Sequence, residues 1–205
     1  MSITKAELRS MVNARLHSLT QSERQESDRQ IVARFLEHPW TAEAGTIFAY
    51  YGVGTEIQTT ALLRHLLRMG KRVLLPRTIQ NGQMDAVEME SVEALAEGML
   101  GIPEPKSGRV VPKGGIDLIL VPNLCCDRRG YRLGQGGGYY DRYLADYSGR
   151  TIALCRSVTL FDSLLVQSFD QPVQRVLTER EELVRSNETL CRTQSAASGK
   201  GEVYT

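Results

Sequence analysis

The residues best suited to chemistry lie in one glycine-rich stretch, residues 127–144, whose sequence is DRRGYRLGQGGGYYDRYL. Glycines lack the Cβ atoms that keep phosphate oxygens away from backbone N–H groups. Arg132 and Arg142 flank the glycines and offer charge-assisted hydrogen bonds to the same anion. Asp141 is suited to hold a divalent cation, which commonly binds through one or two carboxylates together with substrate phosphates. The stretch therefore predicts a phosphate-binding site.

The elements on either side of the glycines support this interpretation. An apolar run, residues 116–121, precedes them and ends at Pro122, which predicts a buried strand. Tyr140, Tyr143 and Leu144 then recur at helical spacing, so a helix is expected to begin near Tyr139. The first amides of a helix lack internal partners and carry partial positive charge. The alternative is a plain turn, because neither the dinucleotide-binding nor the Walker spacing of glycines is present.

Composition narrows the class of protein. The chain has 205 residues, of which 41% are hydrophobic and 24% charged, with a formal net charge of +1. A near-neutral charge argues against a general nucleic-acid binder, and no apolar run is long enough to cross a bilayer. The N-terminal segment is amphipathic, carries Glu7 and does not resemble a secretory signal. We expect a cytoplasmic monomer that binds a small molecule and has no nucleic-acid or membrane partner.

The four cysteines do not form a metal-ligand pattern. Cys125 and Cys126 are adjacent, so in a strand they would point to opposite faces, which is poor geometry for one metal ion. Free cysteine behaves as a small hydrophobic residue in reducing compartments. We therefore expect reduced, partly buried thiols, no disulfide and no zinc.

Local patterns predict an α/β fold. Capping boxes at Thr4–Glu7 and Thr20–Glu23 predict two N-terminal helices, the second ending at Pro39. A strand over 46–51, a leucine-rich helix that stops at Gly70 and a strand over 71–76 then form a unit that joins parallel strands. Further strands are expected at 84–89 (an edge), 151–155 and 176–179, and a rigid connector at 101–105. The fold class is a three-layer α/β/α sandwich with a mostly parallel central sheet, as one domain over 1–189, followed by a disordered tail over 190–205.

Polar residues outside the glycine stretch are expected near it. Tyr51 and Glu56 follow the first strand, and the loops after strand carboxyl ends are where open α/β sheets bind ligands. Taken alone, Glu56 is typical of an acid at the start of a helix. Lys5 and Arg9 lie four residues apart and project from one side of the first helix, which alone is typical of a solvated basic edge.

The run RLGQGGGYYDR, residues 132–142, resembles the signature of the 5-formyltetrahydrofolate cyclo-ligase family, also called 5,10-methenyltetrahydrofolate synthetases. Lys5 and Arg9 match the family's Lys-x-x-x-Arg helix. Residues 56–59 match its Glu-Val/Ile-x-Thr pattern, and residues 101–105 its Gly-Ile-x-Glu-Pro element. The resemblance extends over residues 3–180 and implies that ATP and 5-formyltetrahydrofolate become 5,10-methenyltetrahydrofolate, ADP and phosphate. In that reaction the formyl oxygen attacks the γ-phosphate, and N10 of the folate then closes the ring.

The resemblance also implies residue roles. Arg132, Tyr139 and Lys5 are the expected catalytic residues, and Asp141 is the expected ligand of Mg²⁺. Tyr51, Glu56 and Tyr139 are expected to bind the folate, where a carboxylate suits the paired N–H donors of a 2-amino-pterin edge. The expected ATP-binding residues are Lys5, Arg9, Arg132, Leu133, Gly134, Gln135, Gly136, Gly137, Gly138, Tyr139 and Tyr140.

The chain departs from the family pattern toward its C-terminus. Arg156, Thr159 and Gln174 stand where the family often has Phe, Gln and Asp. Residues 165–170 replace a Pro-x-Glu-x-His-Asp element, of which Asp170 remains. Two alternatives therefore stay open, because sites rather than folds decide function. One is a non-catalytic protein that binds nucleotide or folate, and the other is a sugar-phosphate isomerase or deacylase of similar architecture that needs no ATP.

Overall fold

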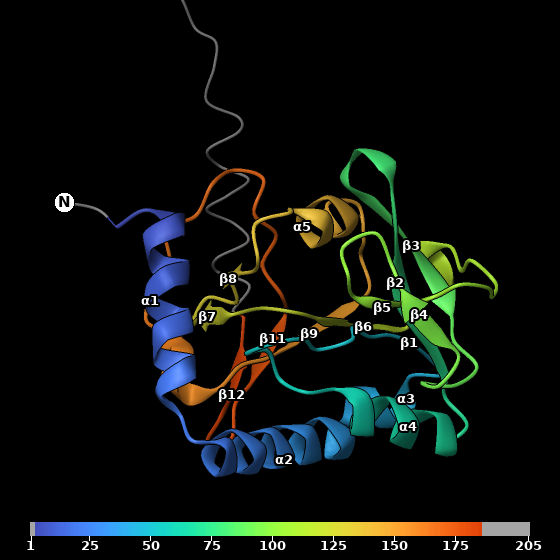
Figure 1. The fold of residues 1–205 in the computed structure, drawn as a ribbon, viewed down its shortest axis with the longest axis horizontal. Helices are drawn as coiled ribbons and strands as arrows, with labels where there is room; N and C mark the ends of the chain where they lie inside the picture. Colours follow the sequence, from blue (N-terminus) through green and yellow to red (C-terminus); the bar gives the residue numbers. More distant parts are fainter. Residues whose placement is uncertain (1–2, 186–205) are drawn as a thin grey trace, which may run out of the picture.

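A computed structural model, which describes residues 3–185, is built around a seven-stranded sheet in the order β12-β11-β9-β6-β1-β2-β3 (Figure 1). The strands are β1 (Thr46–Phe48), β2 (Arg72–Ile79), β3 (Gln83–Glu88), β6 (Leu118–Val121), β9 (Arg150–Leu154), β11 (Arg175–Leu177) and β12 (Glu182–Val184). The strands from β11 to β2 pair in parallel, whereas β3 and β12 pair antiparallel at the two edges. The predicted mostly parallel sheet and the edge strand over 84–89 are confirmed.

The central strands are apolar at successive positions because both faces of the sheet are buried. Ile47 of β1 packs into one core cluster with Leu118 and Leu120 of β6, whereas Phe48 joins Ile119 on the opposite face. All five of these side chains are fully buried. Continuous apolar runs such as residues 118–121 are therefore expected for strands of this kind, and they fix the sheet at the centre of the molecule.

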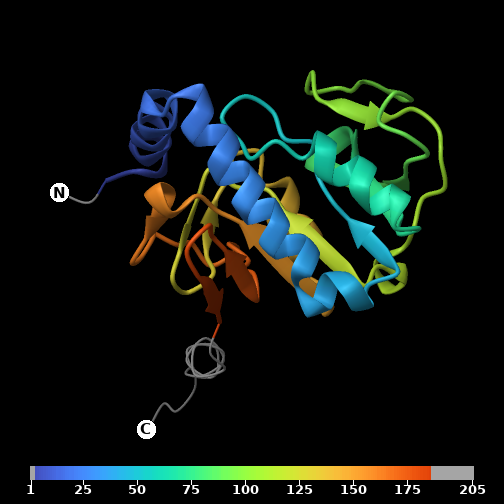
Figure 2. The same cartoon turned by 90° about the horizontal axis from the view of Figure 1, so that it is seen from below.

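One face of the sheet is covered by helices, as Figures 1 and 2 show. These are α2 (Gln21–Glu37), α3 (Pro39–Glu43) and α4 (Thr60–Arg68). Ile31 and Phe35 of α2 and Leu62, Leu63 and Leu66 of α4 supply the apolar side chains on this side. The helices thus bury the face that Ile47 occupies, which confirms the α/β class.

The other face carries a thinner layer. Here the short helix α5 (Tyr139–Leu144) packs Tyr143 and Leu144 against the sheet. Beside it lies a three-stranded sheet in the order β10-β7-β8, formed by β7 (Cys125–Asp127), β8 (Arg132–Leu133) and β10 (Leu160–Phe161). The second outer layer of the sandwich therefore combines helix with short strands.

Helix α1 (Lys5–Ser18) packs on this small sheet. Leu8, Val12 and Leu16 line its inner side and join a cluster with Cys125 of β7. Cys126 belongs to the cluster on the opposite side of β7, so the predicted opposite orientation of the two cysteines is confirmed. Both predicted capping boxes, at Thr4 and Thr20, are present.

Several local expectations need correction. Pro39 begins α3 as its first residue after α2 has ended at Glu37. Strand β2 continues through Pro76, because β1 pairs only as far as Leu74 and the missing N–H then faces no partner strand on that side. Part of the connector over 101–105 is a strand, since β5 (Pro103–Pro105) pairs with β4 (Leu95–Glu97).

Three further observations concern the ends of the chain and the membrane. Strand β12 was not expected, because three residues of mixed polarity carry no recognisable period. Among the described residues, no helix has both the length and the apolar character that crossing a bilayer requires. Cys191 and the tail over 190–205 lie outside the described residues.

Candidate active site

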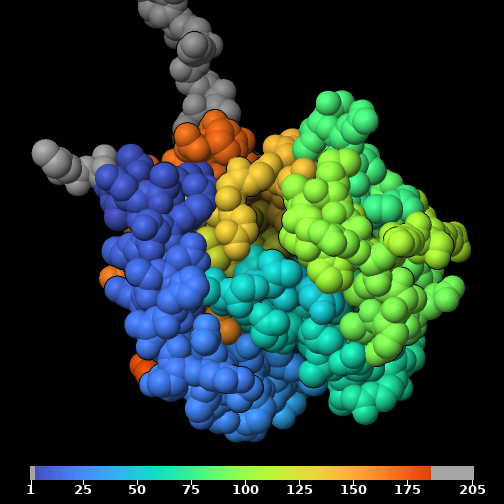
Figure 3. Space-filling view, in the orientation of Figure 1, coloured from blue at the N-terminus to red at the C-terminus, as the bar shows by residue number. Residues whose placement is uncertain are grey.

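The candidate site lies where the strand order of the sheet reverses. From β1 the chain proceeds to β2 on one side, whereas β6, β9 and β11 follow on the other side. Open α/β sheets bind ligands in the crevice outside the strand carboxyl ends at such a point. A cavity of about 280 Å³ opens there, lined by Tyr50 and Tyr51 after β1 and by Pro122 after β6. Figure 3 shows the surface hollowed between the glycine-rich stretch and the light green segment that leads into β5.

The glycines give the cavity an open backbone wall. Gly136 has φ +105° and Gly138, the residue before α5, has φ +67°, both in the region that favours glycine. A Cβ on Gly136 would lie 3.2 Å from the guanidinium carbon of Arg9. A Cβ on Gly138 would lie 2.8 Å from Nη1 of Arg142. Both positions therefore require glycine, and the backbone faces the cavity without side chains of its own there.

Arg142 holds this wall in place from behind. Its guanidinium donates to the carbonyl oxygen of Gly82 from Nε and Nη2, at 2.8 and 2.6 Å, and to that of Gly137 at 2.7 Å. Gly82 lies in the turn between β2 and β3. Arg142 does not line the cavity. The expectation that Arg142 binds an anion beside Arg132 is therefore replaced by a role in tying the glycine stretch to the hairpin.

Arg132 is the buried cation of the cavity wall. Its side chain is 4% exposed, and its Nη2 donates to Oδ1 of Asp141 at 3.1 Å. Its Nε is buried without a hydrogen-bond partner in the protein, as is the hydroxyl of Tyr140. Buried polar groups normally have partners, so these two point to a ligand with acceptor atoms. A phosphate would satisfy the guanidinium.

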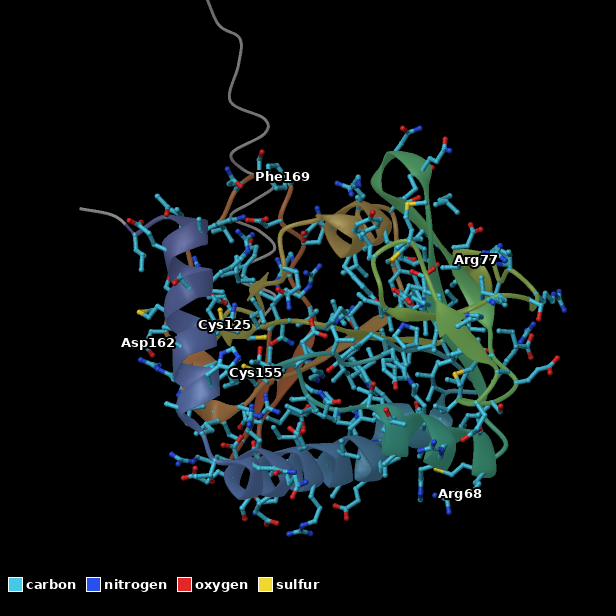
Figure 4. All side chains as sticks on the ribbon, viewed as in Figure 1. Arg68, Arg77, Cys125, Cys155, Asp162 and Phe169 are labelled. Atoms are coloured by element: carbon cyan, nitrogen blue, oxygen red, sulfur yellow. The ribbon has the colours of Figure 1, made fainter. Side chains whose placement is uncertain are left out.

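Helix α1 brings two more cations to the cavity. Lys5 Nζ lies 2.7 and 2.6 Å from the carboxylate oxygens of Asp170, and Arg9 Nε donates to the carbonyl oxygen of Gly134 at 2.8 Å. Lys5 also lies 5.4 Å from the centre of the Phe169 ring, an exposed side chain labelled in Figure 4. Residues from the first and last parts of the domain thus meet at one edge of the cavity.

The acidic residues of the cavity suit a cation shared with a ligand. Oδ1 of Asp141 accepts from Arg132 and from the backbone N–H of Gln171, the latter at 3.1 Å. Within residues 3–185 no cluster of three or more His, Cys, Asp or Glu side chains is arranged to hold a metal ion. A Mg²⁺ ion at Asp141 would therefore complete its coordination with phosphate oxygens and water, which is its usual mode of binding.

Glu56 lines the same cavity. It is 8% exposed, and its carboxylate accepts from the N–H of Val53 at 3.1 Å and from Gln135 Nε2 at 3.3 Å. Burial raises the pKa of the Glu56 carboxyl, while the bonds from Val53 and Gln135 lower it. A buried carboxylate with capacity for more donors is suited to a ligand with adjacent N–H groups.

Apart from Arg142, all the site residues predicted from the sequence line this one cavity. Some further residues that line the cavity were not predicted from the sequence. Tyr50 is fully buried, and burial raises the pKa of its phenol well above the ordinary value. An apolar wall comes from the β2–β5 region and includes Pro76, Met84, Leu100 and Ile102. Ordinary apolar residues of this kind carry no chemical signal in a sequence.

The departures from the family pattern lie partly in the cavity wall, where Gln167 and Phe169 of the replaced element are lining residues, and partly away from it. Arg156, Thr159 and Gln174 are not among its lining residues. Gln174 accepts from the N–H of Thr151 at 3.2 Å, and Thr159 Oγ1 donates to the carbonyl oxygen of Arg156 at 3.1 Å. Gln174 and Thr159 therefore have hydrogen-bond partners within the protein, whereas Nε of Arg156 is buried without one.

The fold and the cavity together define an α/β protein with a cavity at the strand carboxyl ends, whose lining cations suit an anionic ligand. The model of the 5-formyltetrahydrofolate cyclo-ligase family matches residues 1–179. The chain belongs to this family.

Individual relatives agree with the family match. The chain is 30% identical over 175 residues to the 5-formyltetrahydrofolate cyclo-ligase of Escherichia coli K12, covering 82% of this chain and 96% of the relative. It is 35% identical over 147 residues to that of Mycolicibacterium smegmatis, covering 68% and 76%. The structure of Aquifex aeolicus 5,10-methenyltetrahydrofolate synthetase superposes with a TM-score of 0.80 at 26% identity, covering 99% of this chain and 97% of that one. The likeness thus extends over nearly the whole length of both chains.

Proposed function

We propose that this protein uses ATP to convert 5-formyltetrahydrofolate into 5,10-methenyltetrahydrofolate, with release of ADP and phosphate. One observation carries the proposal: the cations and open backbone suited to a triphosphate border the same cavity as the buried Glu56 carboxylate. Family membership supplies the reaction, and the cavity supplies sites for both substrates. We expect the protein to act in the cytoplasm as a monomer.

The nucleotide would occupy the end of the cavity that carries the cations. Arg132 Nε and the N–H groups of residues 134–138 are the donors for the phosphates. Lys5 and Arg9 add positive charge from α1, and Leu133, Tyr139 and Tyr140 complete the walls. Asp141 would hold Mg²⁺, which neutralises charge on the phosphates.

The folate would occupy the other end. Glu56 accepts the N–H donors of the pterin edge, as a carboxylate is suited to do. Tyr51 and Tyr139 line the space beside it. Gln135 reaches Glu56 from the glycine stretch, so the walls of the two sites are in contact. In this arrangement the formyl group would lie between Glu56 and the phosphates.

The chemistry then needs positioning and charge stabilisation more than proton transfer. The formyl oxygen attacks the γ-phosphorus and ADP leaves. N10 next attacks the formyl carbon and loses its proton to solvent, and the C–O bond then breaks to release phosphate and give the cyclic methenyl product. Arg132 and Lys5 stabilise the charge that develops on the transferred phosphoryl group, and Tyr139 orients the formyl region. None of the three histidines lines the cavity, consistent with a reaction that needs no histidine base.

Absorbance at the methenyl-folate band tests the proposal directly. We expect a rise when protein, Mg-ATP and 5-formyltetrahydrofolate are mixed, and none when any one of them is left out. Arg132→Met should remove most of the rise, whereas Arg128→Met, an exposed arginine paired with Glu181, should retain it.

The alternatives predict different outcomes. Binding of ATP or folate by calorimetry without any absorbance change would establish the non-catalytic protein. Turnover of a sugar phosphate without nucleotide would establish the isomerase or deacylase. The location of Arg156 and Gln174 away from the cavity supports catalysis over the non-catalytic alternative.

A further inference from the structure

We propose that Arg156 and Asp28 form a buried clamp that positions Glu56 for the folate. The inference rests on the proposed function, because it assigns Glu56 to the pterin. It gives a role to Arg156, a position at which this chain departs from its family's pattern. Both are positioning residues, since neither lines the cavity.

The clamp is a buried ion pair between distant parts of the chain. Arg156 Nη2 lies 2.5 Å from Oδ1 of Asp28, and the two side chains are 4% and 13% exposed. Asp28 belongs to α2, and Arg156 follows β9. Burial raises the pKa of the Asp28 carboxyl, while Arg156 lowers it. The position of each charge is therefore fixed by the other, because an unpaired charge at this depth is costly.

The ion pair forms hydrogen bonds with the backbone on both sides of Glu56, in the loop between β1 and α4. Arg156 Nη1 donates to the carbonyl oxygen of Thr55 at 2.8 Å, immediately before Glu56. Oδ2 of Asp28 accepts from the backbone N–H of Gln58 at 3.1 Å, two residues after it. Two backbone groups that flank Glu56 are thus bound to the two members of one ion pair.

The loop is also held by bonds of its own, since Thr59 Oγ1 accepts from the N–H of Gly52 at 2.9 Å and donates to the carbonyl oxygen of Tyr50 at 2.7 Å. Residues 49–59, between β1 and α4, contain no regular strand or helix. Thr55 Oγ1 donates to Asn13 Oδ1 of α1 at 3.1 Å, and Glu56 N–H donates to Val53 within the loop. A binding group must be held to within about 0.5 Å of its productive position, which requires supporting contacts behind it. The clamp adds such contacts to the backbone on both sides of Glu56.

Stability alone is a poor explanation for this pair. A buried ion pair is often replaced by apolar residues of similar volume without loss of stability. Its two extra bonds go to the backbone on either side of a ligand-facing carboxylate, which an apolar pair could not hold. The geometry therefore favours positioning over simple packing.

The test uses the full chain and the kinetic constants of both substrates. Arg156→Met retains most of the side-chain volume but loses both contacts. We expect it to raise KM for 5-formyltetrahydrofolate about tenfold, with KM for ATP changed less than about twofold, since only folate binding depends on Glu56. Arg156→Lys, which keeps the charge, should give an intermediate KM. Arg64→Met, which removes an exposed pair with Glu93, should match the wild type.

Hydrogen exchange tests the clamp without turnover. The amide of Gln58 should exchange faster in Arg156→Met and in Asp28→Asn, while amides of the central strands keep their protection. If Arg156→Met does not fold, Asp28→Asn provides the same kinetic and exchange readouts. An inactive wild type would refute the proposed function, and faster exchange at Gln58 in the variants would still support the clamp. Unchanged exchange there, or equal rises in both KM values, would overturn it.

Discussion

Replacing Gly136 by alanine tests whether the open backbone wall of the cavity binds the nucleotide. Gly136 has φ +105°, which an alanine adopts only under strain, and the new methyl group would lie 3.2 Å from Nη2 of Arg9. Either the loop rotates away from its present course or Arg9 moves and loses its 2.8 Å bond to Gly134. Both outcomes disturb the wall that faces the phosphates.

The size of the effect follows from these two costs. A non-glycine residue in a sparsely populated backbone region costs about 1–3 kcal/mol. Losing a charge-assisted hydrogen bond costs a similar amount, ~1.5–3 kcal/mol. The two costs are alternatives, because the loop avoids one of them by incurring the other. If the cost appears in nucleotide binding, KM for ATP should rise roughly 5- to 150-fold, at 1.4 kcal/mol for each factor of ten.

The assay is the initial rate of methenyl-folate formation over a range of ATP concentrations. Gly70→Ala is the matched control, because Gly70 has φ +73° and its Cβ would meet nothing within 4 Å at the end of α4, away from the cavity. We expect Gly70→Ala to lower the melting temperature without altering KM for ATP. Equal KM values for ATP in Gly136→Ala and Gly70→Ala would refute the proposal that the open backbone wall binds the nucleotide.

Four further predictions concern the site. Arg132→Met should lower kcat/KM for ATP roughly 10- to 150-fold, the value of about 1.5–3 kcal/mol for hydrogen bonds to a charged group. Asp141→Asn should raise the Mg²⁺ concentration for half-maximal rate, while Asp146→Asn, at an exposed aspartate, should not. Burial raises the pKa of Glu56, so KM for the folate should rise as pH falls through that pKa, because only the carboxylate accepts the pterin donors. A raised native pKa also means that this group's contribution to stability is present at acid pH and is lost as pH rises, so Glu56→Gln should increase the melting temperature at neutral pH.

The sequence was most informative where structure is decided locally. Capping boxes at Thr4 and Thr20 involve residues three apart, and the fully buried run over 118–121 needs only its apolar content to indicate a central strand. The short strands β7, β8 and β10 were not predicted, because two or three residues cannot display a period.

The same distinction applies to the site. The residues carried by a motif, such as Arg132 and Glu56, line the cavity, although their roles stay predictions. Arg142 was predicted to bind an anion but instead donates to the carbonyl oxygen of Gly82. The sequence did not indicate this acceptor, because Gly82 lies 60 residues away in the chain. The contact between Arg156 and Asp28 joins residues 128 apart. Such pairs are set by how the elements pack, and neither residue signals its partner through spacing.

The pair between Lys5 and Asp170 spans 165 residues and has a consequence for the order of folding. As a chain emerges from the ribosome, α1 appears first, yet Lys5 gains its partner only after nearly the whole domain has been made. The cavity wall formed by these residues therefore closes late in synthesis, and domains generally fold as units. Substrates that bind only the complete cavity would stabilise the finished domain over every shorter chain. Binding at this site would thus report that the chain has been made and folded at least as far as Asp170.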